Sequence, residues 1–274
     1  MTVYYIAVGS IRLKICVVGI FKYRTQQIID ELMKMMSSDN EARNLTEIEY
    51  VLYICDSDEH LEILGRKIHV CESNESWVFR LIQELENNVV EMLNCTTIHG
   101  NFLSIKDECF MLVGARMSGK TTLTQTLLQY IDASLAGDDM IFLRGNAVAG
   151  LGTPLLIRGN ETHIKAGHIN TVDDEGVLRV LIPTKHFANA LRWPNYIFFP
   201  QYRVNCKPEI ERLTSIATFK ALMQNVRHHS SVQQLKLDIL RLADIPAYRI
   251  TYQSQQNAIN LMGEVLPYIR RTLA

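Results

Sequence analysis

The sequence has no apolar run long enough to cross a bilayer as a helix, and no excess of either charge. A membrane-spanning helix needs about 20 consecutive apolar residues. Proteins that bind nucleic acids or anionic membranes usually carry a surplus of basic residues, whereas the formal net charge here is -1. We therefore expect neither a nucleic-acid partner nor a membrane partner.

Zinc and redox signatures are also missing. The six cysteines form no C-x-x-C pair, and their spacing matches no zinc site. The apolar N-terminal segment 1–21 is interrupted by Arg12 and Lys14 and lacks the cleavage site of a signal peptide. These features predict a soluble, cytoplasmic protein with reduced thiols.

No stretch rich in proline, glycine or serine marks a linker, but the pattern of apolar residues changes near residue 92. Residues 1–92 combine strand-like runs with amphipathic helical segments at 25–36 and 76–92. This pattern predicts a small α+β unit for substrate recognition or oligomerisation. Residues 93–274 contain many short strands and helices, which is typical of a mixed α/β domain. The predicted fold class is α/β with a smaller N-terminal α+β unit.

Residues 114–121, with the sequence GARMSGKT, match the pattern G-x-x-x-x-G-K-[ST] in full. An apolar run at 109–113 precedes them and an amphipathic helix is expected over 120–131, which is the context of a phosphate-binding loop (P-loop). Such a loop surrounds phosphates with backbone N–H groups and the positive end of a helix. Lys120 would reach the β- and γ-phosphates, and Thr121 would bind Mg²⁺. The residues expected to contact the nucleotide are Gly114, Ala115, Arg116, Met117, Ser118, Gly119, Lys120, Thr121 and Thr122.

Motifs of two other nucleotide-binding classes are missing. The chain has no N-K-x-D guanine motif and no L-S-G-G-Q helix start, so neither a GTPase nor a transport ATPase is favoured. Two adjacent carboxylates, Asp138 and Asp139, follow a short strand-like run behind the expected helix. Successive side chains of a strand point to opposite faces, so both converge on the loop only if the strand bends. Gly137 would permit that bend.

His99 is placed by counting along a predicted hairpin. Apolar runs at 101–105 and 109–113 flank a polar turn, and a turn centred on Asp107 would set His99 opposite Ala115. A histidine there would contact a phosphate or tune an aspartate. The alternative is a histidine that only satisfies polar groups at the end of a strand. His163, Lys165 and His168 are interpreted as a solvated loop, with a substrate-binding loop as the alternative. Arg227-His228-His229 is interpreted as an exposed turn between helices, with a patch for acidic peptides or phosphate as the alternative.

Together, Ile98-His99-Gly100, the loop at 114–121 and Gly137-Asp138-Asp139 resemble the HPr serine kinase/phosphorylase family. That family shares its nucleotide core with the phosphoenolpyruvate carboxykinases. The resemblance implies ATP and Mg²⁺ as cofactors, Asp138 as the base toward a serine hydroxyl, and Asp139 with Thr121 on the metal side. Lys120 and His99 would complete the catalytic set. The order of the two aspartates is not fixed by the sequence.

Two departures from the family pattern bear on the reaction. Ala147 stands where the family has an acidic residue, and the arginine-rich loop associated with phosphorylase action is not recognisable. The resemblance therefore implies kinase chemistry without the reverse reaction, on a substrate other than HPr. Kinases of lasso-peptide gene clusters are similar stand-alone chains. The hexamers of true HPr kinases imply self-association, and hence a homo-oligomer.

The predicted function is an ATP-dependent kinase that transfers the γ-phosphate to a serine hydroxyl of a peptide or small protein. Two alternatives stay open. One is a kinase of a small metabolite such as free serine, and the other is a nucleotide-binding regulatory module without catalysis. Competition with candidate acceptors would separate the peptide kinase from the metabolite kinase. An Asp138→Asn variant would separate both kinases from the regulatory module, in which it would change nothing measurable.

Overall fold

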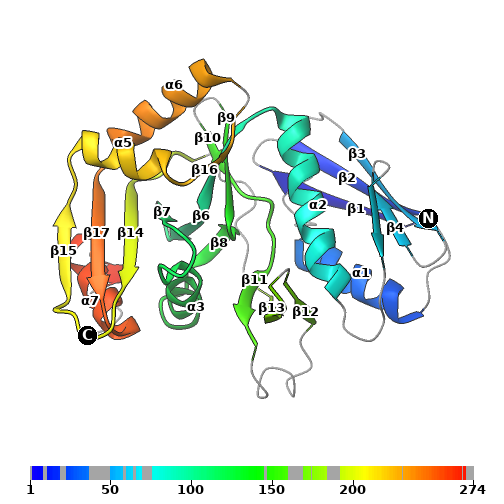
Figure 1. Ribbon diagram of the computed structural model, residues 1–274, viewed down its shortest axis with the longest axis horizontal. Coiled ribbons are helices and arrows are strands. Elements are labelled where there is room, and N and C mark those ends of the chain that lie inside the picture. Colours follow the sequence, from blue (N-terminus) through cyan, green and yellow to red (C-terminus); the bar gives the residue numbers. More distant parts are fainter. Residues whose placement is uncertain are drawn as a thin grey trace. The chain divides into compact units, whose positions relative to one another are not determined.

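The computed structural model describes residues 2–8, 11–18, 23–36, 50–57, 60–63, 66–69, 76–144, 147–159, 169–173, 175–183, 192–229, 231–266 and 268–269. Backbone contacts divide the chain into two compact units. Unit 1 comprises Met1–Met92 and Leu151–Asn189, and unit 2 comprises Leu93–Gly150 and Ala190–Ala274 (Figure 1). The mixture of helices and strands confirms the expected α/β class.

Unit 1 contains a five-stranded sheet and two amphipathic helices. The strands, in their order across the sheet, are β1 (Thr2–Val8), β2 (Ile11–Val18), β3 (Tyr50–Ser57), β4 (His60–Ile63) and β5 (Arg66–His69). Strands β2 and β3 are parallel, and the other neighbours are antiparallel. Helix α1 (Tyr23–Met36) buries Ile29 and Leu32, and α2 (Ser76–Leu93) buries Trp77 and Leu81. Spacings of three and four residues place these side chains on one face of each helix.

A second, three-stranded sheet also belongs to unit 1. Its order is β11 (Leu155–Arg158), β13 (Leu178–Ile182) and β12 (Asn170–Val172). The sequence analysis assigned these residues to the second domain. They group with the first unit because they form a sheet of their own, and because the Thr171 hydroxyl accepts a hydrogen bond from the backbone N–H of Phe79 in α2 at 3.1 Å.

Unit 2 is built on a large mixed sheet with the strand order β10-β9-β6-β7-β14-β17-β15, in which β8 and β16 also pair with β6. Its strands are β6 (Thr96–Ile105), β7 (Glu108–Val113), β8 (Ser134–Gly137), β9 (Met140–Arg144), β10 (Ala147–Ala149), β14 (Tyr196–Tyr202), β15 (Glu209–Arg212), β16 (Val226–His228) and β17 (Ala247–Tyr252). Strands β7, β14 and β17 are parallel to one another. Burial on both faces explains why β7 and β14 are nearly continuous apolar runs.

Four helices of unit 2 accompany this sheet: α3 (Lys120–Tyr130), α5 (Ser215–Met223), α6 (Val232–Ala243) and α7 (Gln255–Val265). Figure 1 shows α5 and α6 together at one end of the sheet and α3 beside β6, β7 and β8. The last three each begin after a Ser or Thr whose hydroxyl accepts a backbone N–H, a standard N-cap. Helix α3 begins instead after Gly119, which has no side chain to cap it.

Strand β6 changes partners on both edges about halfway along. Its first half pairs with β9 and β16, and its second half with β8 and β7. All ten of its residues are buried. The change of partners falls at residues 99–101, so side chains at this point meet residues from several strands.

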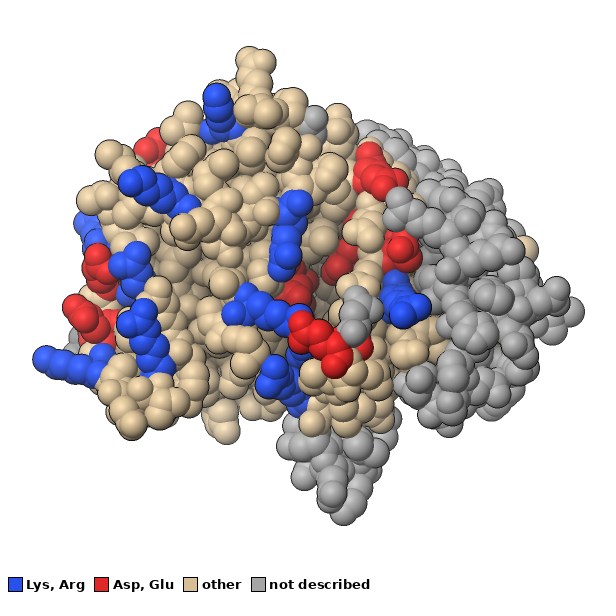
Figure 2. All heavy atoms as spheres, viewed as in Figure 1, with Lys and Arg blue, Asp and Glu red and all other residues tan. Residues whose placement is uncertain are grey.

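The surface of unit 2 carries both signs of charge. On the face drawn in Figure 2, basic and acidic side chains are interspersed over this unit, in keeping with a formal net charge of -1 for the whole chain. None of the helices within the described segments is long and apolar enough to cross a membrane.

Candidate functional site

The β6–β7 hairpin fixes the position of His99. Its turn consists of two residues, Lys106 and Asp107, because Ile105 pairs with Glu108. Lys106 has the positive φ of 55° that tight hairpin turns require. The register runs on to Gly100 opposite Val113 and, continued by one residue, would set His99 beside Gly114. The prediction of Ala115 was wrong by one residue because it assumed a longer turn.

The glycine loop, residues 114–119, joins β7 to α3. Ser118 N–H donates to the Ala115 carbonyl at 3.2 Å, and Met117 and Gly119 have φ values of 67° and 98°. A Cβ on residue 119 would lie 2.2 Å from the Tyr252 hydroxyl oxygen, and one on residue 114 would lie 2.8 Å from Ser118 Oγ. Glycine at 119 thus serves both the close approach and the left-handed backbone, whereas glycine at 114 avoids a contact with the Ser118 side chain.

Lys120 lies beneath the glycine loop. Its residue is 4% exposed, and Nζ donates to the carbonyl oxygens of Gly114 at 2.8 Å and Ala115 at 3.1 Å. Burial lowers the pKa of the Lys120 ammonium, and the charges of Asp139 and Asp138 oppose this shift. Lys120 thus lies within electrostatic range of both carboxylates.

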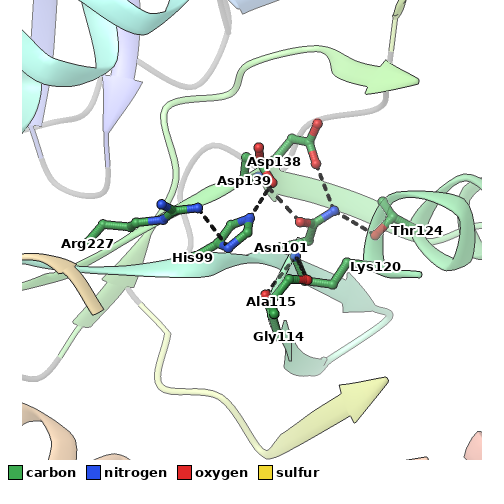
Figure 3. A network of polar contacts seen from close by, with 9 residues as sticks. All are labelled: His99, Asn101, Gly114, Ala115, Lys120, Thr124, Asp138, Asp139 and Arg227. Carbon is green, nitrogen blue, oxygen red and sulfur yellow. Dashed lines mark hydrogen bonds and ion pairs between the residues drawn. The ribbon is translucent and has the colours of Figure 1, made fainter. Parts of the chain in front are cut away.

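The two carboxylates of Asp138 and Asp139 lie on one face of the sheet (Figure 3). Asn101 Nδ2 donates to Asp138 Oδ1 at 2.8 Å, and His99 Nε2 lies 2.9 Å from Asp139 Oδ1. His99 and Asn101 are two residues apart on β6 and so share a face. The carboxylates therefore converge, as the sequence analysis required.

The tight turn that brings them together is at Asp139, and the pairing of β8 with β6 also shifts register beside Gly137. Asp139 has a φ of 61°, and Met140 N–H donates to the Asp138 carbonyl at 2.7 Å across it. Aspartate tolerates this left-handed conformation better than most residues. Gly137 also permits close packing, because a Cβ there would lie 2.8 Å from the Cα of Gly150.

Asn101 connects the aspartate turn to α3. Its amide nitrogen donates both to Asp138 Oδ1 and to Thr124 Oγ1, each at 2.8 Å, and its oxygen accepts from Asp139 N–H at 3.3 Å. The residue is fully buried. Sequence analysis missed Asn101, since an isolated asparagine within an apolar run gives no functional signal.

Arg227 on β16 reaches the same site from the opposite side of His99. Its Nη2 donates to His99 Nδ1 at 3.1 Å. The backbone N–H of His99 donates to the Asn225 carbonyl at 2.8 Å. A guanidinium only donates, so Nδ1 must accept and Nε2 must carry the proton that is donated to Asp139. The sequence analysis interpreted Arg227 as part of an exposed turn between helices. The residue is exposed and lies between α5 and α6, but its strand was missed because the β16–β6 pairing is long-range and leaves no local pattern. His163, Lys165 and His168 lie outside the described residues.

The two aspartates differ in environment. The Asp139 side chain is 65% exposed, whereas Asp138 is 4% exposed. Desolvation raises the pKa of Asp139, but the hydrogen bond from His99 and the charges of Lys120 and Arg227 lower it by more, so the net shift is downward. Asp139 is therefore an ionised carboxylate, open to solvent and oriented by His99.

The remaining predicted nucleotide ligands lie in the glycine loop and in the first turn of α3. Thr121 is half-buried on the first turn of α3, and Arg116, Met117 and Thr122 are exposed. The Ser118 hydroxyl oxygen is buried, and none of the described residues offers it a hydrogen-bond partner. A phosphate oxygen would satisfy it.

Among the described residues no three His, Cys, Asp or Glu side chains form a metal-binding group. Hydroxyl and carboxylate oxygens are nevertheless suitable donors for Mg²⁺, which commonly takes only one or two carboxylates and completes its shell with phosphate and water.

Neither a protein-family model nor a curated protein sequence matches the chain. Among solved structures, the chain is similar to the HPr(Ser) kinase/phosphatase from Coxiella burnetii. The TM-score is 0.27 at 12% sequence identity, and the match covers 65% of this chain and 97% of that chain. A TM-score this low establishes no shared activity.

Proposed function

We propose that the protein is an ATP-dependent phosphotransferase that phosphorylates a serine hydroxyl of a peptide or small protein. One observation carries the proposal. Lys120, buried directly after the glycine loop, lies within electrostatic range of the Asp138 and Asp139 carboxylates, which converge on one face of the sheet. Phosphoryl transfer needs a cationic cradle for the phosphates and a carboxylate for the acceptor side by side.

The glycine loop and the first turn of α3 would hold the triphosphate. Lys120 would exchange its two carbonyl partners for β- and γ-phosphate oxygens, whose negative charge favours the ammonium form that burial disfavours. The orphan Ser118 hydroxyl and the N–H groups at the start of α3 supply further donors. The other contacts are expected from the residues of the loop and from Thr121 and Thr122.

Bound Mg²⁺ would neutralise charge on the phosphates. Thr121 would contribute a hydroxyl oxygen to that ion, as the residue after the lysine does in this type of loop. Asp138 and Asp139 are the two carboxylates from which a second protein ligand would come. The difference in burial between the two carboxylates indicates which of them would bind the metal.

The burial of the aspartates favours an order opposite to the one that the family resemblance implies. A base must meet the acceptor hydroxyl, and Asp139 is open to solvent while Asp138 is not. Asp138 is instead connected through Asn101 to Thr124 on α3, one turn from Thr121. We therefore assign Asp139 to the acceptor side and Asp138 to the metal side.

In the transfer step, Asp139 accepts the proton of the serine hydroxyl as the new O–P bond forms. The bond between the γ-phosphorus and the β–γ bridging oxygen breaks, and ADP leaves. His99 orients Asp139, and Arg227 holds His99 as the Nε2–H tautomer. The site thus positions its base through two hydrogen bonds in series.

The acceptor class rests on the sequence motifs. The Ile98-His99-Gly100 and Gly137-Asp138-Asp139 motifs around the loop resemble those of serine kinases that act on a protein, and this favours a peptidic serine over a metabolite. Residues 1–92 would then recognise substrate or support self-association. A metabolite kinase and a non-catalytic nucleotide sensor remain the alternatives.

The proposal is tested by mass spectrometry of serine-containing peptides incubated with the protein, ATP and Mg²⁺. A gain of one phosphate that is lost with Lys120→Ala supports a peptide kinase and maps the serine. Phosphorylation of free serine alone would support the metabolite kinase. ATP binding without transfer to any acceptor would support the regulatory module and contradict the proposal.

A further inference from the structure

An exposed tyrosine lies directly against the glycine loop. Tyr202, at the end of β14, donates its backbone N–H to the Ser118 carbonyl at 3.1 Å. A Cβ on Gly119 would lie 3.3 Å from Tyr202 Cβ. The tyrosine is nevertheless 47% exposed, so its backbone is fixed to the loop while its ring faces solvent.

A buried tyrosine supports this ring from the neighbouring strand. Tyr252 on β17 is fully buried, and its ring meets Tyr202 edge to face with centroids 5.9 Å apart. Its hydroxyl donates to the Gly119 carbonyl at 3.4 Å, and Arg203 N–H donates to the Tyr252 carbonyl at 2.9 Å. Burial raises the pKa of Tyr252, which keeps the phenol protonated as a donor. The ring of Tyr202 is therefore held by two parallel strands.

Two exposed apolar residues lie on the two segments that meet at Tyr202, one in the glycine loop and one just after the tyrosine. Met117, in the glycine loop, is 68% exposed, and Val204, two residues after Tyr202, is 71% exposed. The hydrogen bond between Tyr202 and Ser118 brings these two segments together. Exposed apolar side chains on segments that border a polar site suit a ligand with an apolar surface.

We infer that Tyr202, with Met117 and Val204 on the adjoining segments, is the platform on which the nucleobase of the bound nucleotide stacks. This inference rests on the proposed nucleotide binding by the glycine loop. A triphosphate on the loop carries its sugar and base outward from the phosphates, and the exposed ring adjoining Gly119 offers a flat π-surface for the base. Every base has a π-face that can stack on an aromatic side chain. Tyr202 would thus supply affinity for the base, and Lys120 affinity for the phosphates.

The test separates the base from the phosphates by comparing ATP with inorganic tripolyphosphate, which has no base. Isothermal titration calorimetry with Mg²⁺ measures both affinities for the wild type, Tyr202→Ala and Tyr202→Phe. Tyr130→Ala is the matched control, since Tyr130 is also exposed (67%) but lies at the far end of α3, about 15 Å from its start. Circular dichroism confirms that each variant is folded.

The inference predicts that Tyr202→Ala weakens ATP binding about tenfold and leaves tripolyphosphate binding within about twofold. Tyr202→Phe and Tyr130→Ala should bind both ligands like the wild type. Equal ATP affinity in the wild type and Tyr202→Ala overturns the platform and leaves the proposed function standing. An equal loss of both ligands in Tyr202→Ala also overturns it, because the tyrosine then only shapes the loop. A wild type that binds neither ligand overturns the proposed function together with the platform.

Discussion

His99 Nε2 donates a hydrogen bond of 2.9 Å to Asp139 Oδ1, although His99 is buried and the Asp139 side chain is 65% exposed. A buried ring held on both of its nitrogens thus aims an exposed carboxylate. Such a pair is suited to a base that must keep its orientation while it meets a substrate from solvent. The expected outcomes below follow from this pair and from the elements that hold it.

Replacing Arg227 should slow transfer without preventing ATP binding. Arg227→Met removes the donor to His99 Nδ1, so the ring loses its fixed tautomer and Asp139 its orientation. We expect kcat to fall about tenfold or more while the ATP dissociation constant changes by less than about threefold. His228→Ala, at an exposed position on the same strand, is the control and should leave both unchanged.

A double-mutant cycle tests whether Arg227 acts through His99. Combining Arg227→Met with His99→Ala should be no slower than His99→Ala alone, because residues in one network are not additive. Fully additive losses would show that Arg227 acts on the phosphates by a separate route.

Stability should depend on pH through Asp139. The pKa of Asp139 is lowered in the folded protein, so its carboxylate stabilises the fold above the unfolded-state pKa of about 3.9. This contribution is lost as pH falls through the folded-state pKa. In urea unfolding, the stability difference between the wild type and Asp139→Asn should therefore be larger at about pH 7 than at about pH 3. The same difference at both pH values would contradict this linkage.

Gly119→Ala should destabilise the protein more than an alanine at another left-handed glycine. Its Cβ would lie 2.2 Å from the Tyr252 hydroxyl oxygen, at a φ of 98°. Overpacking and the left-handed backbone together cost about 2–4 kcal/mol. Gly176→Ala has a φ of 75° and nothing within 4 Å of its Cβ, so it should cost only about 1 kcal/mol. Thermal unfolding measures both, and equal losses would show that the contact with Tyr252 relaxes freely.

Asn101→Asp should be tolerated poorly, and increasingly so as pH rises. The change replaces the donor to Asp138 and Thr124 by an oxygen, which sets two buried carboxylates against each other once both ionise. We expect a loss of at least about 2 kcal/mol at neutral pH and a smaller loss at about pH 5, measured by chemical unfolding. Asn101→Leu, which adds no charge, should show no such pH dependence.

Local patterns predicted part of this arrangement well. The hairpin around Lys106 and Asp107 and the helix from Lys120 to Tyr130 follow from apolar periodicity and the fixed spacing of the glycines. The sequence analysis predicted that Asp138 and Asp139 converge only if the strand bends, but it did not identify Asp139 as the residue at the turn. Gly137 was the natural choice from backbone freedom, and the strand is irregular beside it, but the tight turn is at Asp139.

Long-range pairing explains what the sequence could not give. Arg227 reaches His99 only because β16 adds to the free edge of β6 beyond the end of β7, and Asn101 reaches α3 only after the sheet has formed. The grouping of residues 151–189 with unit 1 is of the same kind. None of these contacts leaves a periodic or spaced signal along the chain.

The central claim is that a nucleotide bound at the glycine loop donates its phosphate to a hydroxyl activated beside His99. The most direct test measures ATP affinity and phosphate transfer in parallel for the wild type, Asp138→Asn and Asp139→Asn, with the peptide found by mass spectrometry. We expect Asp139→Asn to bind ATP within about threefold of the wild type and to transfer phosphate at least about 100-fold more slowly. Asp138→Asn should weaken the Mg²⁺ dependence of ATP binding as well as transfer. Unchanged transfer in Asp139→Asn would contradict the account, and a loss confined to Asp138→Asn would return the role of base to Asp138.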